Sequence, residues 1–495
     1  MKKHTIRLHP LGKEIQVNDQ TPLIDVLHEF GIEFPCGGKG TCGKCKVRLL
    51  DGEINTTENH QQKISQLGLA SDWRLACFSR CTSDITLEIE QLNHLILADE
   101  SEFDFIPQKG FGIAVDLGTT TIVAQLVDLS SAKVLAIETM LNPQLRFGTD
   151  LISRIQACLD GHAAEMTQII RASIGTMIEL MLKKHQVELQ KVAIVGNTVM
   201  QLIFSDGDVS PLSMYPFHTD NLGLKSFGTE ELGWKFQAEQ KVQFYPSIGS
   251  FVGSDILAGI AATGLHQKEK YTALIDLGTN GEIVIGNKLQ IVCASTAAGP
   301  AFEGANISMG IRAVTGAISS LNLSDGKMEA SVIGNTEPKG ICGSALIDAV
   351  AILRKLDLIG MFGEINSGES QIHLAGKVNL TQKDINEFQL AKAAIAAGLT
   401  ILAKKLSINL SDIEEIYIAG GFGSYINIGN VVSTGMIELQ EEKIHKMGNT
   451  ALIGAKIFLF SDEEITEEIL AKTRHINLEG DPNFQDIYVD KMLFL

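Results

Sequence analysis

The sequence predicts a small α+β domain of about 90 residues, followed by a larger α/β part made of two similar lobes. Three observations lead to this prediction. Strand-like alternation surrounds a glycine-rich cysteine cluster near the N-terminus, apolar runs alternate with helical patterns in the remainder, and one strand–loop–strand pattern occurs twice there. With 495 residues, the chain is also too long for a single hydrophobic core.

The N-terminal domain is expected at residues 1–90. Apolar and polar residues alternate over 4–17, 45–50 and 84–90, which predicts strands. The intervening "PLIDVLHEFGI" has helical spacing, with Gly31 as its stop.

A flexible linker is expected to follow the first domain. The segment 91–110, "QLNHLILADESEFDFIPQKG", turns acidic and then reaches a proline and a glycine.

The larger part contains an internal repeat. "FGIAVDLGTTTIVAQL" (111–126) and "YTALIDLGTNGEIVIG" (271–286) share an apolar strand, Asp-Leu-Gly-Thr and a second apolar strand. We therefore expect lobe I at 111–270 and lobe II at 271–495, with the C-terminal segment returning to lobe I. Strand-like runs lie at 111–117, 122–128, 192–195, 273–277, 283–285 and 415–419, and helical patterns at 150–185 and 386–406.

Composition excludes several classes of protein. Hydrophobic residues make up 45% and charged residues 20%, as in soluble globular proteins. The net charge of −18 argues against a nucleic-acid partner. No apolar run is long enough for a membrane span, and the basic N-terminus lacks the apolar segment of a signal peptide, so a cytoplasmic protein is expected. Eight cysteines are too few for a disulfide scaffold, and five of them fall between Cys36 and Cys81, which indicates a metal or redox site.

The cysteine cluster favours iron–sulfur over zinc. Cys36, Cys42 and Cys45 have the spacing C-x5-C-x2-C on a loop with four glycines, and a fourth thiol follows at Cys77 or Cys81. Zinc sites usually pair two C-x2-4-C knuckles. Three cysteines plus a distant fourth is the plant-type iron–sulfur pattern with one loop residue added.

On these residues, the segment 1–90 resembles a 2Fe–2S ferredoxin domain of β-grasp fold. The resemblance implies that Cys77, which follows "RLA", is the fourth ligand. The remaining cysteines have apolar or small neighbours and are interpreted as buried inert thiols: Cys158, Cys293 and Cys342.

The repeated loops indicate a phosphate-binding site. Asp116 and Asp276 each end an apolar strand, and a tight glycine turn after each would expose backbone amides to an anion. The aspartates can hold Mg²⁺ through water. The expected loop residues are Gly118, Thr119, Thr120 and Thr121 in the first copy and Gly278, Thr279, Asn280 and Gly281 in the second.

A third glycine-rich element follows a strand in "EIYIAGGFGSYINIG", at Gly420, Gly421 and Gly423, where a ligand can approach the backbone. The alternative is that these glycines only shape sharp turns. Asn197 and Asp255 each lie between an apolar strand and a helix, where they either face the cleft or cap the helix.

Taken in order, these elements resemble the ASKHA superfamily of actin, sugar kinases and Hsp70. The resemblance implies ATP and Mg²⁺ as ligands, phosphate loops at 116–121 and 276–282, and an adenosine site at 420–423. Asp116, Asp276 and Asn197 are then the candidate catalytic residues.

A 2Fe–2S domain ahead of an ASKHA ATPase resembles the RACo-like reductive activators of corrinoid proteins. Segments 293–313, 340–350 and "AGGFG" resemble motifs of that family. The resemblance implies an ATP-hydrolysing activase that passes an electron to the inactive cobalt(II) corrinoid of an anaerobic methyltransferase or O-demethylase system, restoring cobalt(I). It also implies a low-potential donor such as a ferredoxin or flavodoxin, a homodimer, and by analogy a contact between Glu303 and cobalt.

One feature departs from the family. Well-known members carry an extra domain between the linker and the ATPase, whereas only 38 residues lie between Cys77 and Asp116. This departure puts the geometry of a dimer in doubt.

Three alternative functions stay open from the residues alone. The chain could activate another low-potential metalloenzyme, act as a redox-regulated ASKHA phosphotransferase, or serve as a nucleotide-gated scaffold whose cluster senses redox state.

Overall fold

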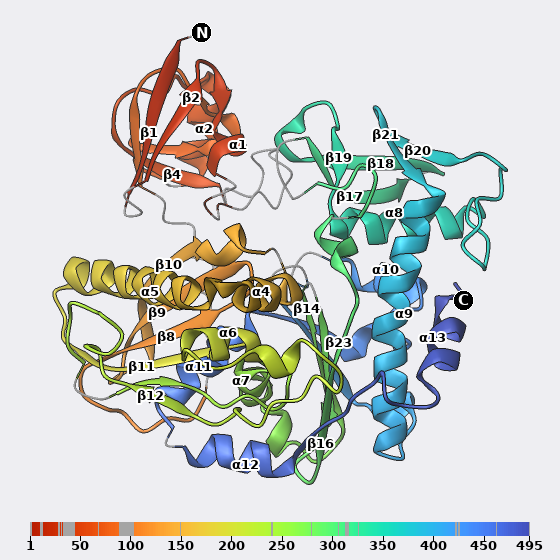
Figure 1. Ribbon diagram of the computed structural model, residues 1–495. Coiled ribbons are helices and arrows are strands. Elements are labelled where there is room, and N and C mark those ends of the chain that lie inside the picture. The colour runs from red at the N-terminus through yellow and green to blue at the C-terminus, as the bar shows by residue number, and fades with distance from the viewer. Residues whose placement is uncertain are drawn as a thin grey trace. The chain divides into compact units, whose positions relative to one another are not determined.

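The computed structural model describes residues 2–9, 13–27, 30, 32, 45–67, 69–88, 103–148, 150–238, 241–278, 280–304, 306–311, 316–324, 326–420, 423, 426–461 and 463–494 (Figure 1). The chain forms two compact units. One comprises Met1–Ala98, Pro300–Gln389 and Phe494–Leu495, and the other comprises Asp99–Gly299 and Leu390–Leu493.

The N-terminal domain is built on a five-stranded mixed sheet of order β2-β1-β7-β4-β5. Strands β1 and β7 are parallel, and the other neighbouring pairs are antiparallel. The apolar positions of the predicted alternation, such as Ile6, Leu8 and Val47, face the core. The sheet strands are β1 (Lys3–His9), β2 (Lys13–Asn18), β4 (Lys46–Asp51), β5 (Trp73–Leu75) and β7 (Ile85–Glu88).

Short elements complete this domain. The predicted helix is present as α1 (Leu23–Leu27), and α2 (Glu58–Gln66) begins at the N-cap Thr57. A small sheet pairs β3 (Thr21–Pro22) with β6 (Arg80–Cys81), and one helical turn, η2 (Ala76–Phe78), separates β5 from β6.

Two six-stranded sheets of matching topology form the second unit. Their orders are β10-β9-β8-β11-β13-β12 and β16-β15-β14-β22-β23, with β24 beside β16. In each sheet an antiparallel hairpin that begins with the Asp-containing strand is followed by parallel strands. The internal repeat read from the sequence is therefore a repeat of topology.

The strands of the first sheet are β8 (Phe111–Leu117), β9 (Thr121–Asp128), β10 (Lys133–Leu141), β11 (Leu189–Gly196), β12 (Lys225–Phe227) and β13 (Val242–Phe244). Those of the second are β14 (Thr272–Leu277), β15 (Gly281–Gly286), β16 (Ile291–Thr296), β22 (Glu415–Ala419), β23 (Ile444–Gly448) and β24 (Thr473–His475). The six strand-like runs predicted from the sequence all coincide with strands.

Helices cover the sheets as their patterns predict. The helical pattern at 150–185 forms α4 (Leu151–Ala157) and α5 (Ala163–His185), separated by a π-helical turn. The pattern at 386–406 lies in α9 (Gln382–Lys405). The remaining helices of this unit are α6 (Thr198–Phe204), α7 (Ser254–Thr263), α10 (Ile428–Ser433), α11 (Thr450–Phe458), α12 (Glu464–Lys472) and α13 (Phe484–Met492).

Helices α7 and α11 pack against each other and connect the two sheets. Helix α11 contacts β8, β9 and β11, and α7 contacts both β11 and β14. The two backbones are in direct contact, since a side chain at Gly454 would lie 2.1 Å from the carbonyl oxygen of Ala258. Both helices begin at the edge where the two Asp-containing strands end.

Residues 300–389 form most of the rest of the first unit, and Ala317 and Ile333 belong to the same hydrophobic core as Ile6 of the N-terminal domain. The elements of this segment are β17 (Ala317–Ser324), β18 (Lys327–Val332), β19 (Gly340–Ile341), α8 (Gly343–Lys355), β20 (Gln371–Ala375) and β21 (Val378–Thr381). Among the described residues, no helix is both long and apolar enough to cross a membrane.

Candidate functional site

Strand pairing brings two of the predicted cluster ligands together. Cys45 directly precedes β4, and Cys77 lies one residue beyond Ala76, whose amide donates to the carbonyl oxygen of Cys45 at 2.8 Å. Because β4 and β5 are antiparallel neighbours, the two cysteines meet although 32 residues separate them. Their Sγ atoms lie 3.2 Å apart, and Cys45 is buried.

This geometry suits a shared metal. The distance is far longer than the ~2.05 Å of a disulfide. A tetrahedral metal with metal–sulfur bonds of about 2.3 Å separates two sulfur ligands by roughly 3.8 Å, so small adjustments place both thiolates on one ion. Cys36 and Cys42 lie outside the described residues. The part of the predicted ligand set that the structure describes therefore fits a thiolate-bound cluster.

Cys81 occupies a different position. It is buried in β6, and its thiol donates to the carbonyl oxygen of Ser83 at 3.3 Å. Burial raises the pKa of the Cys81 thiol to about 11, which disfavours the thiolate. The structure thus favours Cys77 over Cys81 as partner of Cys45.

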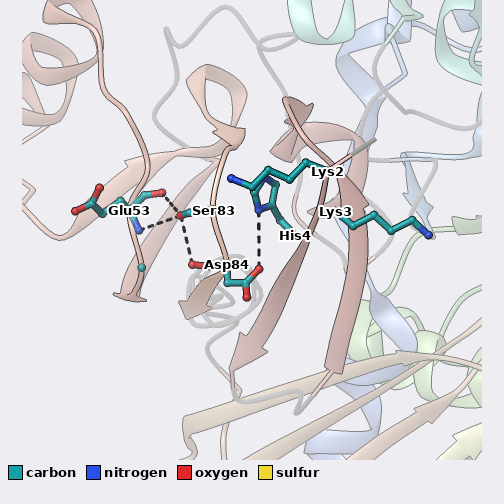
Figure 2. A pocket seen from close by; sticks show the side chains of 7 residues that line it. Lys2, Lys3, His4, Glu53, Ser83 and Asp84 are labelled. Carbon is teal, nitrogen blue, oxygen red and sulfur yellow. Dashed lines mark hydrogen bonds and ion pairs between the residues drawn. The ribbon is translucent and has the colours of Figure 1, made fainter.

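An open pocket of about 530 Å³ lies on the same domain (Figure 2). Gly52 and Glu53 follow the end of β4, whereas Cys45 precedes its start, so the pocket lies at the opposite end of that strand. The lining residues are Lys2, Lys3, His4, Gly52, Glu53, Ser83 and Asp84. Mixed charges and open walls give it no chemistry that relates to the cluster.

The two Asp–Gly turns each close with a backbone hydrogen bond from the glycine amide, and the second turn is one residue shorter than the first. After Asp116, the amide of Gly118 donates to the carbonyl oxygen of Thr121 at 3.1 Å, and after Asp276 the amide of Gly278 donates to that of Asn280 at 3.0 Å. A Cβ on Gly118 would lie 2.6 Å from the Thr121 oxygen, so the first turn requires glycine. Thr279 lies outside the described residues.

Three buried polar side chains support the first turn. Asn142 Nδ2 donates to the carbonyl oxygen of Gly118 at 2.9 Å, and Arg154 Nη2 donates to that of Thr119 at 2.5 Å. Asn197 Nδ2 donates to Thr119 Oγ1 at 3.0 Å, while its Oδ1 caps α6 by accepting from the amide of Met200. Asn197 therefore caps α6 and also contacts the first turn, while its position in a ligand cleft stays a prediction.

Four carboxyl groups converge where β8, β14, β15 and α7 meet. Each keeps some access to solvent, but the dense surroundings desolvate them, and desolvation is the main cause of their raised pKa values. The pKa rises to about 6 for Asp116 and to about 7 for Asp255 and Asp276, and that of Glu282 rises well above its usual value. Mutual repulsion contributes as well, since Asp116 acts on Asp255 and Asp276, and these two act on Glu282. A cation bound beside these groups would favour their charged forms and so lower their pKa values.

Asp255 is not the N-cap of α7, because Gly253 holds that position. Its Oδ1 accepts from the amide of Ile256 at 2.8 Å, and its charge interacts with Asp116 and Asp276. The cleft-facing interpretation of Asp255 is the one that the structure favours.

Two further contacts complete the site. Asn449, the N-cap of α11, donates from Nδ2 to Asp116 Oδ2 at 2.7 Å. Gly420 follows β22 with φ +88°, and a Cβ there would lie 2.6 Å from Asp276 Oδ1. The first glycine of the predicted adenosine element thus lies directly against the second aspartate. Gly423 also requires glycine, because a Cβ there would lie 2.6 Å from the Ala419 oxygen.

Some predicted site residues are not described. Gly421 lies outside the described residues, and so does the side chain of Glu303, the last residue of the short helical turn Pro300–Glu303. Within the described ranges, no three His, Cys, Asp or Glu side chains are placed to ligate a metal ion together. A divalent cation at the carboxyl cluster would therefore keep water ligands, as Mg²⁺ prefers.

Sequence reasoning missed Asn449, Asn142 and Arg154. Asn449 has the sequence signal of a helix cap, but its contact with Asp116 spans 333 positions. Arg154 looks like an ordinary helix residue, yet it is completely buried, and burial lowers its pKa to about 10.

Comparison with known proteins agrees with this organisation. A model described as "2Fe-2S iron-sulfur cluster binding domain" matches residues 6–82, one described as "RACo middle region" matches 111–268, and one described as "C-terminal domain of RACo the ASKHA domain" matches 270–495. The region that the second model calls the middle region is present here and coincides with the segment expected as lobe I.

Similar proteins match along most of the chain. The corrinoid activation enzyme RamQ of Eubacterium limosum is 32% identical over 98% of both chains. The Co(II) methylated amine-specific corrinoid protein reductase of Methanosarcina barkeri is 26% identical over 78% of this chain and 77% of its own. A solved structure, "Reductive activator for corrinoid,iron-sulfur protein", is 28% identical with a TM-score of 0.67 and covers 99% of this chain and 98% of that one. The alignment with RamQ extends over 585 positions, so RamQ carries residues without a counterpart here.

The resemblance read from the sequence is confirmed by these matches. The fold class is confirmed too: a ferredoxin-like N-terminal domain precedes an ASKHA domain.

Proposed function

The chain belongs to the RACo-like family of reductive activators of corrinoid proteins, and on this premise we propose that it reduces the inactive cobalt(II) corrinoid of a methyltransferase corrinoid protein to cobalt(I) in an ATP-dependent reaction. The observation that carries the proposal is the match with RamQ over 98% of both chains, in a protein that brings Cys45 and Cys77 to 3.2 Å.

The N-terminal domain holds the electron carrier in this proposal. Cys45 and Cys77, with Cys36 and Cys42, would bind a 2Fe–2S cluster, which supplies one-electron transfer. Burial of Cys45 restricts water at the sulfur, a factor that helps to set the potential of such a cluster.

ATP is required in this proposal because the electron must move uphill. A plant-type cluster has a potential of about −400 mV. The cobalt(II/I) couple is expected to lie below it, and each 100 mV of difference costs about 2.3 kcal/mol per electron. ATP can offset that cost only by binding two states of the activator–partner complex differently.

The carboxyl site would bind the phosphates and Mg²⁺. Backbone amides of the turns at Thr119, Thr120 and Thr121, and at Thr279, Asn280 and Gly281, would contact phosphate oxygens, while the amides of Gly118 and Gly278 close the turns. Asp116 and Asp276 would hold Mg²⁺ through water, with Asn449 and Asn197 positioning Asp116 and Thr119. The pKa of about 7 at Asp255 suits a carboxylate that accepts a proton from the attacking water. Gly420, Gly421 and Gly423 would accommodate adenosine.

Several partners belong to the proposal only as predictions. These are a ferredoxin or flavodoxin as electron donor, a homodimer, and a contact of Glu303 with cobalt. Replacing Glu303 with Ala and finding unchanged activation kinetics would remove the last of them.

The test is anaerobic reduction of candidate corrinoid proteins. The reconstituted protein is mixed with a low-potential reductant and a cobalt(II) corrinoid protein, and loss of the cobalt(II) absorbance is followed with and without Mg·ATP. We expect ATP-dependent loss, abolished in a Cys77→Ala variant that still binds nucleotide. Equal rates without ATP would contradict the proposal, and phosphate transfer to a metabolite would identify a phosphotransferase instead.

A further inference from the structure

The segment that leads from the N-terminal domain is held by an aromatic cluster on the second unit. Phe103 and Phe105 contact Phe460, with ring centroids 5.5 and 4.9 Å apart, and lie 5.7 Å from each other. We call these three residues the aromatic clamp. The alternate residue Ile106 is 78% exposed, as expected for an extended segment with one face docked.

Polar contacts reinforce the clamp. Gln108 Nε2 donates to the carbonyl oxygen of Phe460 at 3.3 Å, and the backbone amide of Gln108 donates to the carbonyl oxygen of Leu129 at 2.9 Å. The Nζ of buried Lys456 lies 5.5 Å from the Phe103 ring, within the range of a cation–π contact. Residues 103–108 are therefore docked on the far end of α11.

The opposite end of α11 lies at the carboxyl site. Its N-cap Asn449 donates to Asp116, and about 15 Å of helix separates this contact from Phe460. Tyr245 holds the C-terminal end through its hydroxyl bond to the Phe458 carbonyl and a stacked ring at 4.5 Å. Gly454 gives α11 backbone contact with α7, which carries Asp255. One rigid element thus connects the carboxyl site to the clamp.

We propose that helix α11 couples the carboxyl site to the docked segment 103–108, so that nucleotide binding at Asp116 and Asn449 alters the aromatic clamp. This inference rests on the proposed function in one respect, that a nucleotide binds there. Thermodynamic linkage makes the coupling reciprocal. If nucleotide binding changes the equilibrium constant for clamp opening by a given factor, clamp opening changes the nucleotide affinity by the same factor.

The test is hydrogen–deuterium exchange of the full-length, cluster-loaded protein. Exchange of the peptide 103–110 is measured with and without saturating Mg·AMPPNP, and nucleotide binding is measured by calorimetry on the same sample. We expect at least a threefold change in the exchange rate. The F103S/F105S variant should exchange rapidly in both conditions and show a nucleotide Kd shifted by the same factor. Ile106→Ser, exposed in the same segment, is the matched control and should behave as the parent protein.

Two outcomes overturn the inference while leaving the proposed function intact. One is unchanged exchange of 103–110 despite measured nucleotide binding. The other is a full nucleotide-dependent change in Asn449→Ala, which would mean that the signal does not pass through α11. If calorimetry detects no nucleotide binding at all, the proposed ATP dependence fails, and the inference fails with it.

Discussion

Replacing Gly420 with alanine tests whether the glycine-rich element and the second aspartate form one site. Gly420 has φ +88°, which costs an L-residue about 1–2 kcal/mol. The new Cβ would lie 2.6 Å from Asp276 Oδ1 and 2.7 Å from the carbonyl oxygen of Leu277. The second contact is backbone and yields little, so the Asp276 carboxylate must move by several tenths of an ångström.

The magnitude follows from the role proposed for Asp276. A shift of about 1 Å in a positioned group can cost on the order of 100-fold in rate, so about half that shift predicts roughly a tenfold loss of Mg·ATP affinity or turnover. Tenfold corresponds to about 1.4 kcal/mol.

The matched control is Gly233→Ala. Gly233 also has a positive φ, +72°, but a Cβ there meets nothing within 4 Å. Both variants should lose thermal stability through the positive φ, and Gly420→Ala should lose more because of its added clashes, but only Gly420→Ala should lose nucleotide affinity. The assay is calorimetric titration with Mg·AMPPNP beside a thermal melt. Equal nucleotide affinity in the two variants would refute the reasoning.

Three further predictions concern the same sites. Cys77→Ala should lose the EPR signal of the cluster and its bound iron. Cys81→Ala should keep both, because the Cys81 thiol donates to the backbone carbonyl oxygen of Ser83. Equal loss of iron from the two variants would contradict the ligand assignment. Mg·AMPPNP affinity should fall as pH drops from 8 to 6, because the raised pKa values of Asp255 and Asp276 lead to protonation of groups that Mg²⁺ needs as carboxylates. Calorimetry should show proton release on binding. An affinity that does not depend on pH would exclude this cause. Asn197→Ala should cost about 1 kcal/mol of stability through the lost helix cap, measured by thermal melting. It should also weaken nucleotide binding through the lost contact with Thr119, measured by titration. A change in stability without a change in nucleotide binding would show that Asn197 acts only as a helix cap.

Local patterns were enough for the elements and for the type of chemistry. Apolar runs in the sequence located the strands β8, β9, β14 and β15, because a buried strand is made of apolar residues that are consecutive in the chain. The glycine after each Asp–Leu pair predicted a turn that no side chain could enter, and at Gly118 the close Thr121 oxygen agrees.

Contacts between distant segments could not be read in this way. The cysteine spacing left Cys77 and Cys81 open, the family resemblance favoured Cys77, and the pairing of β4 with β5 is what brings Cys77 to Cys45. The role of Asn449 depends on the packing of α11 against β8. A sequence carries the preference of each segment but not which segments become neighbours.

By itself, therefore, the sequence determined the kind of ligands: thiolates for a cluster, and aspartates beside glycine turns for phosphate and Mg²⁺. Only the tertiary structure decided that four carboxyl groups meet where desolvation raises their pKa values, and that α11 leads from them to Phe103 and Phe105. The physical reason is that desolvation and charge repulsion depend on distances through space, which are set by packing across hundreds of residues.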